Sequence, residues 1–93
     1  MPADDEPFQY PIDGTLDLHQ FPSQETKEIV EEYIRECLDR NILTLRIVHG
    51  KGKGIKREIV QSVLKHHPQV ARFWNESGSG GGWGATVVDL KPK

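Results

Sequence analysis

The residue types in this chain that could do chemistry fall into three short segments. Residues 16–19 read Leu-Asp-Leu-His, residues 49–54 read His-Gly-Lys-Gly-Lys-Gly, and residues 80–86 read Gly-Gly-Gly-Trp-Gly-Ala-Thr. Imidazoles, whose ordinary pKa is about 6.5, exchange protons near neutral pH. Lysine side chains and flexible backbone amides stabilise negative charge on a phosphate. Together these groups are what a site acting on a phosphodiester would need.

Each segment is weak evidence by itself. An aspartate and a histidine two residues apart are often polar residues on the solvent face of a strand, and spaced glycines often mark only a tight turn. Residues 49–54 do not complete a Walker A motif, because no Gly-Lys-Ser/Thr follows at the right place. Residues 80–85 superficially match a dinucleotide fingerprint, but they precede an expected strand and not a helix.

Hydrophobic periodicity predicts the elements that carry these segments. Strands are expected at residues 14–19, 43–48, 70–74 and 85–90. Helices are expected from an N-cap at Ser23 to about Asn41, and from Ile55 to about His66, where Pro68 stops the second helix.

The same patterns assign each side chain to the core or to solvent. The expected buried helix residues are Val30, Tyr33, Ile34, Cys37, Leu38, Ile55, Ile59, Val63 and Leu64. The acids of the first helix are interpreted as its solvated face. The open face of the sheet is expected to carry Asp17, Thr44, Arg46 and Thr86. For Trp74 the core is favoured over an exposed stacking platform, whereas for Trp83 base stacking and packing over the turn are equally favoured.

The order β-α-β-α-β-β predicts an α/β fold of the α+β two-layer type, with a mixed four-stranded sheet and both helices on one face. Ligands of such sheets bind beyond the carboxyl ends of the parallel strands, here at His19 and His49. The last strand runs the other way, so it begins at that same edge. Both helix N-termini point there and favour an anion. The three segments are therefore expected to meet.

Composition sets the limits within which this site is interpreted. The chain has 93 residues, enough for one domain, which we expect at residues 13–93 after an acidic, proline-containing tail at 1–12. Net charge is −9 over residues 1–39 and +7 over residues 40–93, which is compatible with a local anion-binding face. A single cysteine, Cys37, excludes an internal disulfide and a cysteine zinc site. Without a signal or membrane-spanning stretch, a cytoplasmic location is expected.

On these motifs the chain resembles the small MutS-related (Smr) domain family, over roughly residues 14–91. The resemblance rests on residues 16–19, 49–52 and 82–88, in the family's order and spacing. One departure is Gln20-Phe21, where the family's first motif usually continues with glycine. The resemblance implies a βαβαββ sandwich similar to the C-terminal domain of translation initiation factor three, with the last strand antiparallel between the second and third.

The resemblance also implies nucleic-acid binding and, as in several members, endonuclease activity on structured RNA or on branched or nicked DNA, some of it ribosome-associated. It implies that Asp17 and His19 take part in cleavage. It assigns substrate contact or catalysis to the second motif, His49, Gly50, Lys51 and Gly52, and to the third, Gly82, Trp83 and Gly84. On this resemblance the chain is expected to be a stand-alone member.

The leading hypothesis is cleavage of a phosphodiester, with RNA favoured, by general acid–base chemistry. His19 is assigned as the base, Asp17 as the residue that orients it, and His49 as the second proton-transfer group. No cofactor is expected to be required, and a metal-assisted variant with Mg²⁺ or Mn²⁺ at Asp17 and His19 stays open. The basic and glycine positions expected to contact nucleic acid are Arg46, Gly50, Lys51, Gly52, Lys53, Gly54, Lys56, Arg57, Gly82, Trp83 and Gly84.

Two other function classes stay open. A non-catalytic nucleic-acid or ribosome binding module would use the same basic cluster for backbone contacts and would have no turnover to lose. A protein-interaction adaptor would use the acidic first helix and would tolerate charge reversal at Lys51 and Lys53. A monomer is favoured under each hypothesis.

Overall fold

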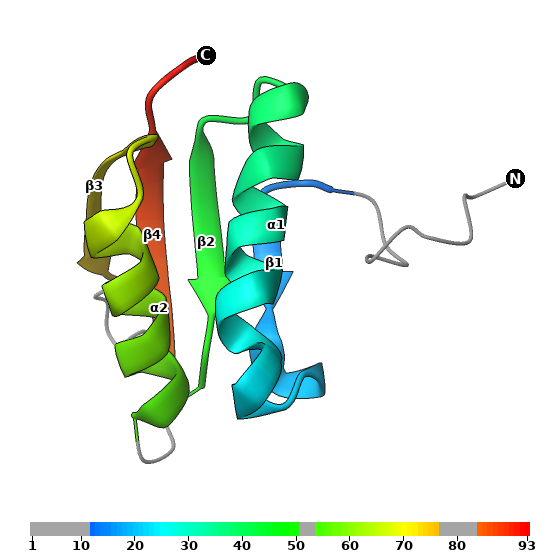
Figure 1. The fold of residues 1–93 in the computed structure, drawn as a ribbon, viewed down its shortest axis with the longest axis vertical. Coiled ribbons are helices and arrows are strands. Elements are labelled where there is room, and N and C mark those ends of the chain that lie inside the picture. The colour runs from blue at the N-terminus through cyan, green and yellow to red at the C-terminus, as the bar shows by residue number, and fades with distance from the viewer. Residues whose placement is uncertain (1–11, 51–53, 77–83) are drawn as a thin grey trace, which may run out of the picture.

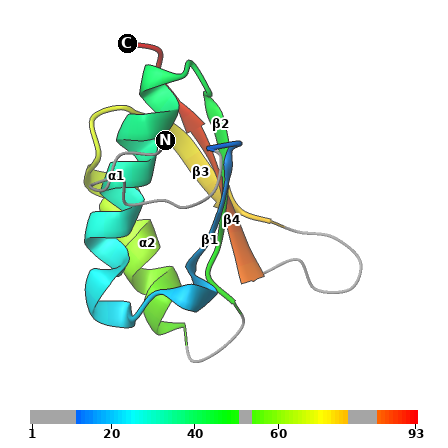
Figure 2. The same cartoon turned by 90° about the vertical axis from the view of Figure 1, so that its right-hand side faces the viewer.

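The computed structural model describes residues 12–50, 54–76 and 84–93. Four strands form one sheet, and the two α-helices lie together on one of its faces (Figures 1 and 2). The strands are β1 (Thr15–Asp17), β2 (Thr44–Val48), β3 (Val70–Asn75) and β4 (Ala85–Leu90). The helices are α1 (Thr26–Asp39) and α2 (Ile55–His66), and short 3-10 helices span Leu18–Gln20 and Ser23–Glu25. The expected βαβαββ order and two-layer arrangement are confirmed.

The strand order across the sheet is β1-β2-β4-β3. β1 pairs with β2 in parallel, while β4 is antiparallel to both of its neighbours, β2 and β3. β4, which follows the other strands in the chain, therefore fills a central position, as the resemblance implies. The carboxyl ends of β1 and β2 and the start of β4 lie at the same edge, so the topology brings together the described parts of the three predicted segments.

The core lies between the sheet and the helices. α1 contributes Val30, Tyr33, Ile34 and Cys37, all buried as predicted, with Leu38 partly buried. In α2 the stripe is Val60, Val63 and Leu64, and Ile59 packs partly against it. Ile55 was expected in the core but is 54% exposed. The reason is angular: Ile55 lies five residues before Val60, which turns its side chain about 140° from the buried stripe.

The first strand is shorter than predicted. β1 ends at Asp17, and Leu18–Gln20 forms a 3-10 turn, so His19 lies on that turn and not on the strand. Leu18 is fully buried, as a residue facing inward from a longer strand would also be. A second 3-10 turn precedes α1, so Glu25 and not Ser23 is the residue that precedes the first α-helical turn.

The two faces of the sheet differ from the prediction at two positions. Trp74 was favoured as a core residue but is 43% exposed, because it pairs with Val87 on the face away from the helices. Its neighbour Phe73 packs against the core from the other side of β3. Thr86 was expected on the open face but is fully buried, on the same side of β4 as Val88 and Leu90.

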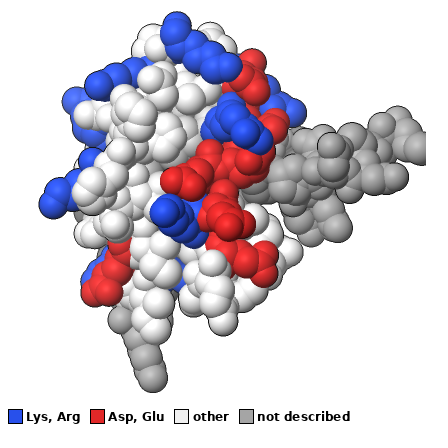
Figure 3. All heavy atoms as spheres, viewed as in Figure 1, with Lys and Arg blue, Asp and Glu red and all other residues white. Residues whose placement is uncertain are grey.

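The acidic residues of α1 form a solvent-facing surface on the helix layer (Figure 3). Glu28 and Glu31 are exposed, and Arg35 and Arg40 form ion pairs with Glu32 and Glu36. These pairs within one helix support the interpretation of the acidic run as a solvated helix face. Ile12, from the predicted tail, packs against the core, and the rest of that tail lies outside the described residues. Within the described part of the chain, neither helix has the length and apolar content needed to cross a membrane.

Candidate functional site at the edge of the sheet

Asp17 and His19 form a hydrogen-bonded pair at the end of β1. Asp17 caps the 3-10 turn: its Oδ1 accepts from the His19 backbone N–H at 2.9 Å and lies 2.6 Å from His19 Nδ1. Because an ionised carboxylate can only accept, Nδ1 carries the proton and Nε2 keeps its lone pair. The His19 side chain is 60% exposed. Nε2 is thus suited to take a proton from a substrate.

The electrostatics of Asp17 support this assignment. Partial burial raises the pKa of its carboxyl, but the hydrogen bonds from His19 and the positive charges of His19 and Lys56 outweigh that effect. The pKa of Asp17 is therefore lowered from its ordinary value of 3.8. Asp17 is ionised at neutral pH and would stabilise an imidazolium formed on His19.

Gly50 brings the second segment against the first. Its φ is +80°, a backbone conformation that favours glycine, and a Cβ at this position would lie 2.8 Å from His19 Nε2 and 3.4 Å from Cδ2. The His19 ring therefore lies directly over the Gly50 backbone. Glycine is required here both by the backbone conformation and by the space that the ring occupies.

His49 has a different setting from His19. It is 6% exposed; its Nε2 lies 2.9 Å from Thr86 Oγ1, and its Nδ1 lies 3.1 Å from the Gly50 carbonyl oxygen. Because the carbonyl can only accept, Nδ1 carries the proton and Nε2 accepts from the Thr86 hydroxyl. Burial, and secondarily the charge of Arg57, lowers the pKa of His49 from 6.5, against the opposing effect of the Gly50 carbonyl. A proton transfer by His49 would require one of its two hydrogen bonds to break.

The third segment meets the second through Gly84. Its carbonyl oxygen accepts from the backbone N–H groups of both His49 and Gly50, each at 2.9 Å. With the His49–Thr86 hydrogen bond, these contacts confirm that the start of β4 lies beside the end of β2. The Gly50 amide is bonded to protein here, so it is not a ready donor for a phosphate.

The three described basic residues among the predicted contacts have different settings. Lys56 Nζ donates to the Leu18 carbonyl oxygen at 2.8 Å, so it fixes the turn that carries His19. Arg57 is exposed in the first turn of α2, beside Gly54, whose φ of +83° begins that helix. Arg46 lies on the open face, where its Nε and Nη2 donate to Glu76 at 2.5 and 2.8 Å. The predicted contacts Lys51, Gly52, Lys53, Gly82 and Trp83 lie outside the described residues.

The metal-binding capacity of this edge is small in the part of the chain that the structure describes. There, no group of three or more His, Cys, Asp and Glu side chains is arranged to hold an ion. Asp17 and His19 form a pair whose side chains lie close together, 2.6 Å between Oδ1 and Nδ1. The N-terminus of α2 adds a positive partial charge at the same edge (Figure 1), which favours a phosphate over a cation.

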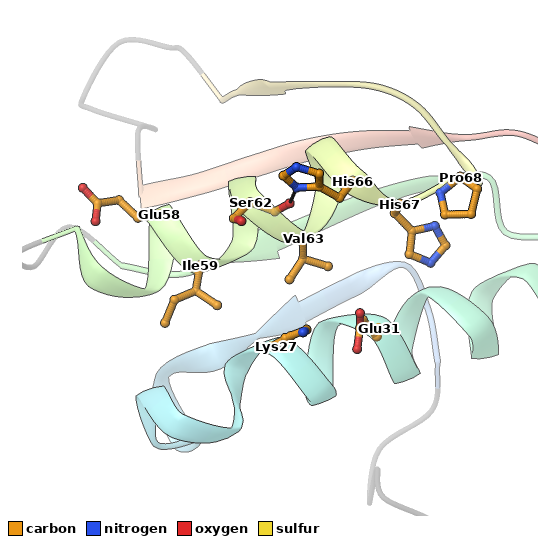
Figure 4. Close-up of a pocket in the computed structure, with 9 residues that line it drawn as sticks. All are labelled: Lys27, Glu31, Glu58, Ile59, Ser62, Val63, His66, His67 and Pro68. Atoms are coloured by element: carbon orange, nitrogen blue, oxygen red, sulfur yellow. Dashed lines mark hydrogen bonds between the residues drawn. The ribbon is translucent and has the colours of Figure 1, made fainter.

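A groove of about 760 Å³ lies elsewhere, between α1 and α2 (Figure 4). Its floor is formed by Ile59 and Val63, and charged or polar side chains surround it. The residues that line it are Lys27, Glu31, Glu58, Ile59, Ser62, Val63, His66, His67 and Pro68. The groove belongs to the helix layer, so its size is no guide to the chemistry at Asp17 and His19.

Two contributors to the site were missed or misplaced by the sequence analysis. The burial of Thr86 could have been predicted from the sequence. Thr86 lies two residues before Val88 and four before Leu90, so it shares their buried face of the strand. Lys56 was expected to contact nucleic acid, and its bond to Leu18 spans 38 residues, which no local pattern reveals.

Comparisons with known proteins identify relatives of this chain in sequence and in fold. The sequence profile of the family described as the Smr domain matches residues 16–91. The chain is 34% identical over 80 residues to endonuclease MutS2 of Clostridium tetani strain Massachusetts / E88, covering 86% of this chain and 10% of that protein. It is 38% identical over 76 residues to endonuclease MutS2 of Staphylococcus saprophyticus, covering 82% and 10% respectively. The chain thus spans about a tenth of the length of these relatives.

Two solved structures share the fold. The crystal structure of the Smr domain of Thermus thermophilus MutS2 superposes with a TM-score of 0.79 at 31% identity, covering 86% of this chain and all of that one. YdaL, a stand-alone small MutS-related protein from Escherichia coli, gives a TM-score of 0.77 at 28% identity, covering 89% of this chain and 68% of that one. The profile match covers most of the chain and includes Asp17, His19, His49 and Gly84. The chain therefore belongs to the Smr domain family.

Proposed function

We propose that this protein is an endonuclease that cleaves phosphodiester bonds in nucleic acid, with structured RNA as the favoured substrate. The observation that carries the proposal is the Asp17–His19 pair, in which the carboxylate holds Nδ1–H and leaves the Nε2 lone pair free on a side chain that is 60% exposed. The names of the MutS2 relatives support a nuclease. Branched or nicked DNA is the alternative substrate.

On RNA, His19 Nε2 takes the proton from the 2′-hydroxyl, and the 2′ oxygen attacks the adjacent phosphorus. The bond from phosphorus to the 5′ oxygen breaks, and that oxygen leaves with a proton, so the products are a 2′,3′-cyclic phosphate and a 5′-hydroxyl. Asp17 keeps the His19 ring in position and stabilises the imidazolium. The phosphate charge would be stabilised by Lys51, Lys53, Arg57 and the N-terminus of α2.

We assign the proton delivered to the leaving oxygen to His49, as the sequence suggests. Its Nε2 accepts from Thr86 at rest, so the assignment requires His49 to take up a proton from solvent and substrate binding to release one of its two hydrogen bonds. His49→Gln tests it through the pH–rate profile. Wild type should show a rate that falls on both sides of an optimum, and His49→Gln should lose one limb. A profile unchanged in shape would limit His49 to positioning Gly50.

The direct test uses end-labelled structured RNA, the same RNA with a 2′-deoxyribose at the cleaved position, and branched DNA. Wild type should cut the RNA, His19→Ala and Asp17→Asn should lose most of that cleavage with little change in affinity, and the deoxy substitution should block it. EDTA distinguishes proton transfer by protein groups from a metal-assisted variant with Mg²⁺ or Mn²⁺. Cleavage that persists in His19→Ala would contradict the proposal.

A non-catalytic nucleic-acid or ribosome binding module is the second candidate, and specific observations favour it. In the described part of the chain both ring nitrogens of His49 and the Gly50 amide are already bonded, so neither group is free to act on a substrate at rest. Under this reading, wild type would bind nucleic acid in a salt-sensitive way and would show no turnover.

We propose a cytoplasmic monomer as the working form. The single cysteine, Cys37, is buried in the core, and burial raises the pKa of its thiol to about 12, so it behaves as an inert apolar side chain. Light scattering of the purified chain tests the monomer directly.

A further inference from the structure

The face of the sheet opposite the helices is left uncovered by the described residues (Figure 2). The strand registers define one row across its middle: Thr15 beside Arg46, Arg46 beside Val87, and Val87 beside Trp74. This row joins an aromatic ring, an aliphatic side chain and a guanidinium on one accessible surface. Polar, aliphatic and aromatic contacts are therefore all available to a ligand lying across the strands.

Trp74 is the unusual member of this row. The side chain is 43% exposed, although adjacent Phe73 shows that β3 had a core face available for an aromatic ring. The Arg72 guanidinium carbon lies 5.6 Å from the centre of the Trp74 ring, and Arg72 Nε donates to Asp89 at 2.7 Å. The ring is therefore held by an anchored cation and does not depend on burial for its position.

Two arginines lie near the Trp74 ring on the same face of the sheet. Arg72 precedes it on β3, and Arg46 lies across Val87 in the same row. Their ion pairs use Nε and Nη2 of Arg46 and Nε of Arg72, so both guanidinium groups keep further N–H donors. Both side chains are substantially exposed, at 46% and 74%. A phosphate could accept from either without breaking the existing pairs.

This surface is continuous with the Asp17–His19 site. Asp17 lies beside Val48 and Val48 beside Ala85, which forms the next row of the same face toward the edge of the sheet. Three strand spacings of about 4.8 Å separate β1 from β3, about 14 Å in all. At a stacked rise of about 3.4 Å per nucleotide, a strand of about four nucleotides would span that distance.

We propose that this face binds an unpaired segment of nucleic acid, with one base stacked on Trp74 and the flanking phosphates contacted by Arg46 and Arg72. The inference rests on the proposed function, because the same strand would continue to His19. Nucleic acid is favoured over a protein partner because the apolar part of the surface is small. Protein interfaces have a larger apolar centre depleted of charge. An aromatic ring beside guanidinium groups is the arrangement that stacks bases.

The test measures affinity in a His19→Ala background, where the nucleic acid stays intact. Fluorescence anisotropy with a labelled single-stranded RNA should show roughly 5- to 150-fold weaker binding for Trp74→Ala, the range for losing one base stack. Trp74→Phe should retain most of the affinity. The control is Ser62→Ala, which shortens an exposed side chain on the helix layer, away from this face, and should leave the affinity unchanged.

A second measurement needs no variant that might misfold. An abasic oligonucleotide of the same length should bind the Trp74 protein about as weakly as the normal oligonucleotide binds Trp74→Ala. Equal affinity of Trp74→Ala and its parent would overturn the inference, and would leave this face to a protein partner. Trp74-dependent binding by a wild type that never cleaves would refute the nuclease while supporting this surface. Cleavage by wild type, with no change in affinity in Trp74→Ala, would support the nuclease and refute this binding surface.

Discussion

Gly50→Ala should disturb the Asp17–His19 pair, whereas the matched variant Gly54→Ala should leave that pair intact. Gly50 and Gly54 have nearly the same positive φ, +80° and +83°. An L-residue in this region costs roughly 1–2 kcal/mol, so both alanine variants should lose about that much free energy of unfolding. At Gly54 the new Cβ would meet Arg57 Nη2 at 3.6 Å, an ordinary contact. At Gly50 it would lie 2.8 Å from His19 Nε2, a distance that cannot persist.

The clash at position 50 is relieved most easily by movement of the His19 ring, because that side chain is 60% exposed and has room to rotate toward solvent. Such a movement breaks the 2.6 Å contact between His19 Nδ1 and Asp17. The added cost in stability is small, about 0.5–1.5 kcal/mol for one hydrogen bond. The loss of cleavage should be large, because general-base catalysis contributes roughly 10²–10⁴-fold. We therefore expect kcat of Gly50→Ala to approach that of His19→Ala, and kcat of Gly54→Ala to stay within a few-fold of wild type.

Urea denaturation, single-turnover cleavage and the NMR signals of the His19 ring together check this expectation. The ring signals should shift in Gly50→Ala and stay in place in Gly54→Ala, a readout that holds even if the protein does not cleave. Equal loss of cleavage in the two alanine variants, or an unmoved His19 signal in Gly50→Ala, would refute the reasoning.

Three further predictions concern the groups around this pair. Thr86→Val should lower the free energy of unfolding by about 1–3 kcal/mol in urea denaturation, because it leaves buried His49 Nε2 unpaired, whereas Thr86→Ser should restore most of the loss. Since the folded pKa of His49 is lowered from 6.5, the unfolded chain takes up its proton first. Stability should therefore fall as pH drops below about 6.5, and His49→Gln should flatten that dependence. Lys56→Met should raise the pKa of Asp17, measured by carboxyl ¹³C titration, and should loosen the turn at Leu18, while Lys56→Arg should change both less.

The sequence was sufficient where one buried face decides the structure. α2 and β4 begin and end at the predicted residues, because their apolar stripes are complete and Pro68 lies just beyond the end of α2. The meeting of the three segments followed from the handedness and direction of the connections alone. Neither result needed any knowledge of side-chain contacts.

The sequence was insufficient where two arrangements bury the same residues. Leu18 is buried whether β1 continues as a strand or ends in a turn. The alternation of apolar and polar residues over 14–19 therefore could not reveal the 3-10 turn that joins Asp17 to His19. Phe73 and Trp74 compete for one core position on a strand with a register shift between Val70 and Arg72. Pairing with β4 settles that competition, and the pairing is a tertiary contact.

The central place of β4 has a consequence for how activity appears during folding. β1, α1, β2, α2 and β3 all precede it in the chain, yet β2 and β3 become neighbours only through it. The hydrogen bonds of His49 to Thr86 and of His49 and Gly50 to Gly84 form only when residues 84–90 are inserted between those strands. Contacts so distant in sequence are slow to form. A chain interrupted before residue 84 would keep both histidines but could not hold His49 and Gly50 in place. The complete site therefore forms only after β4 has joined β2 and β3 in the sheet.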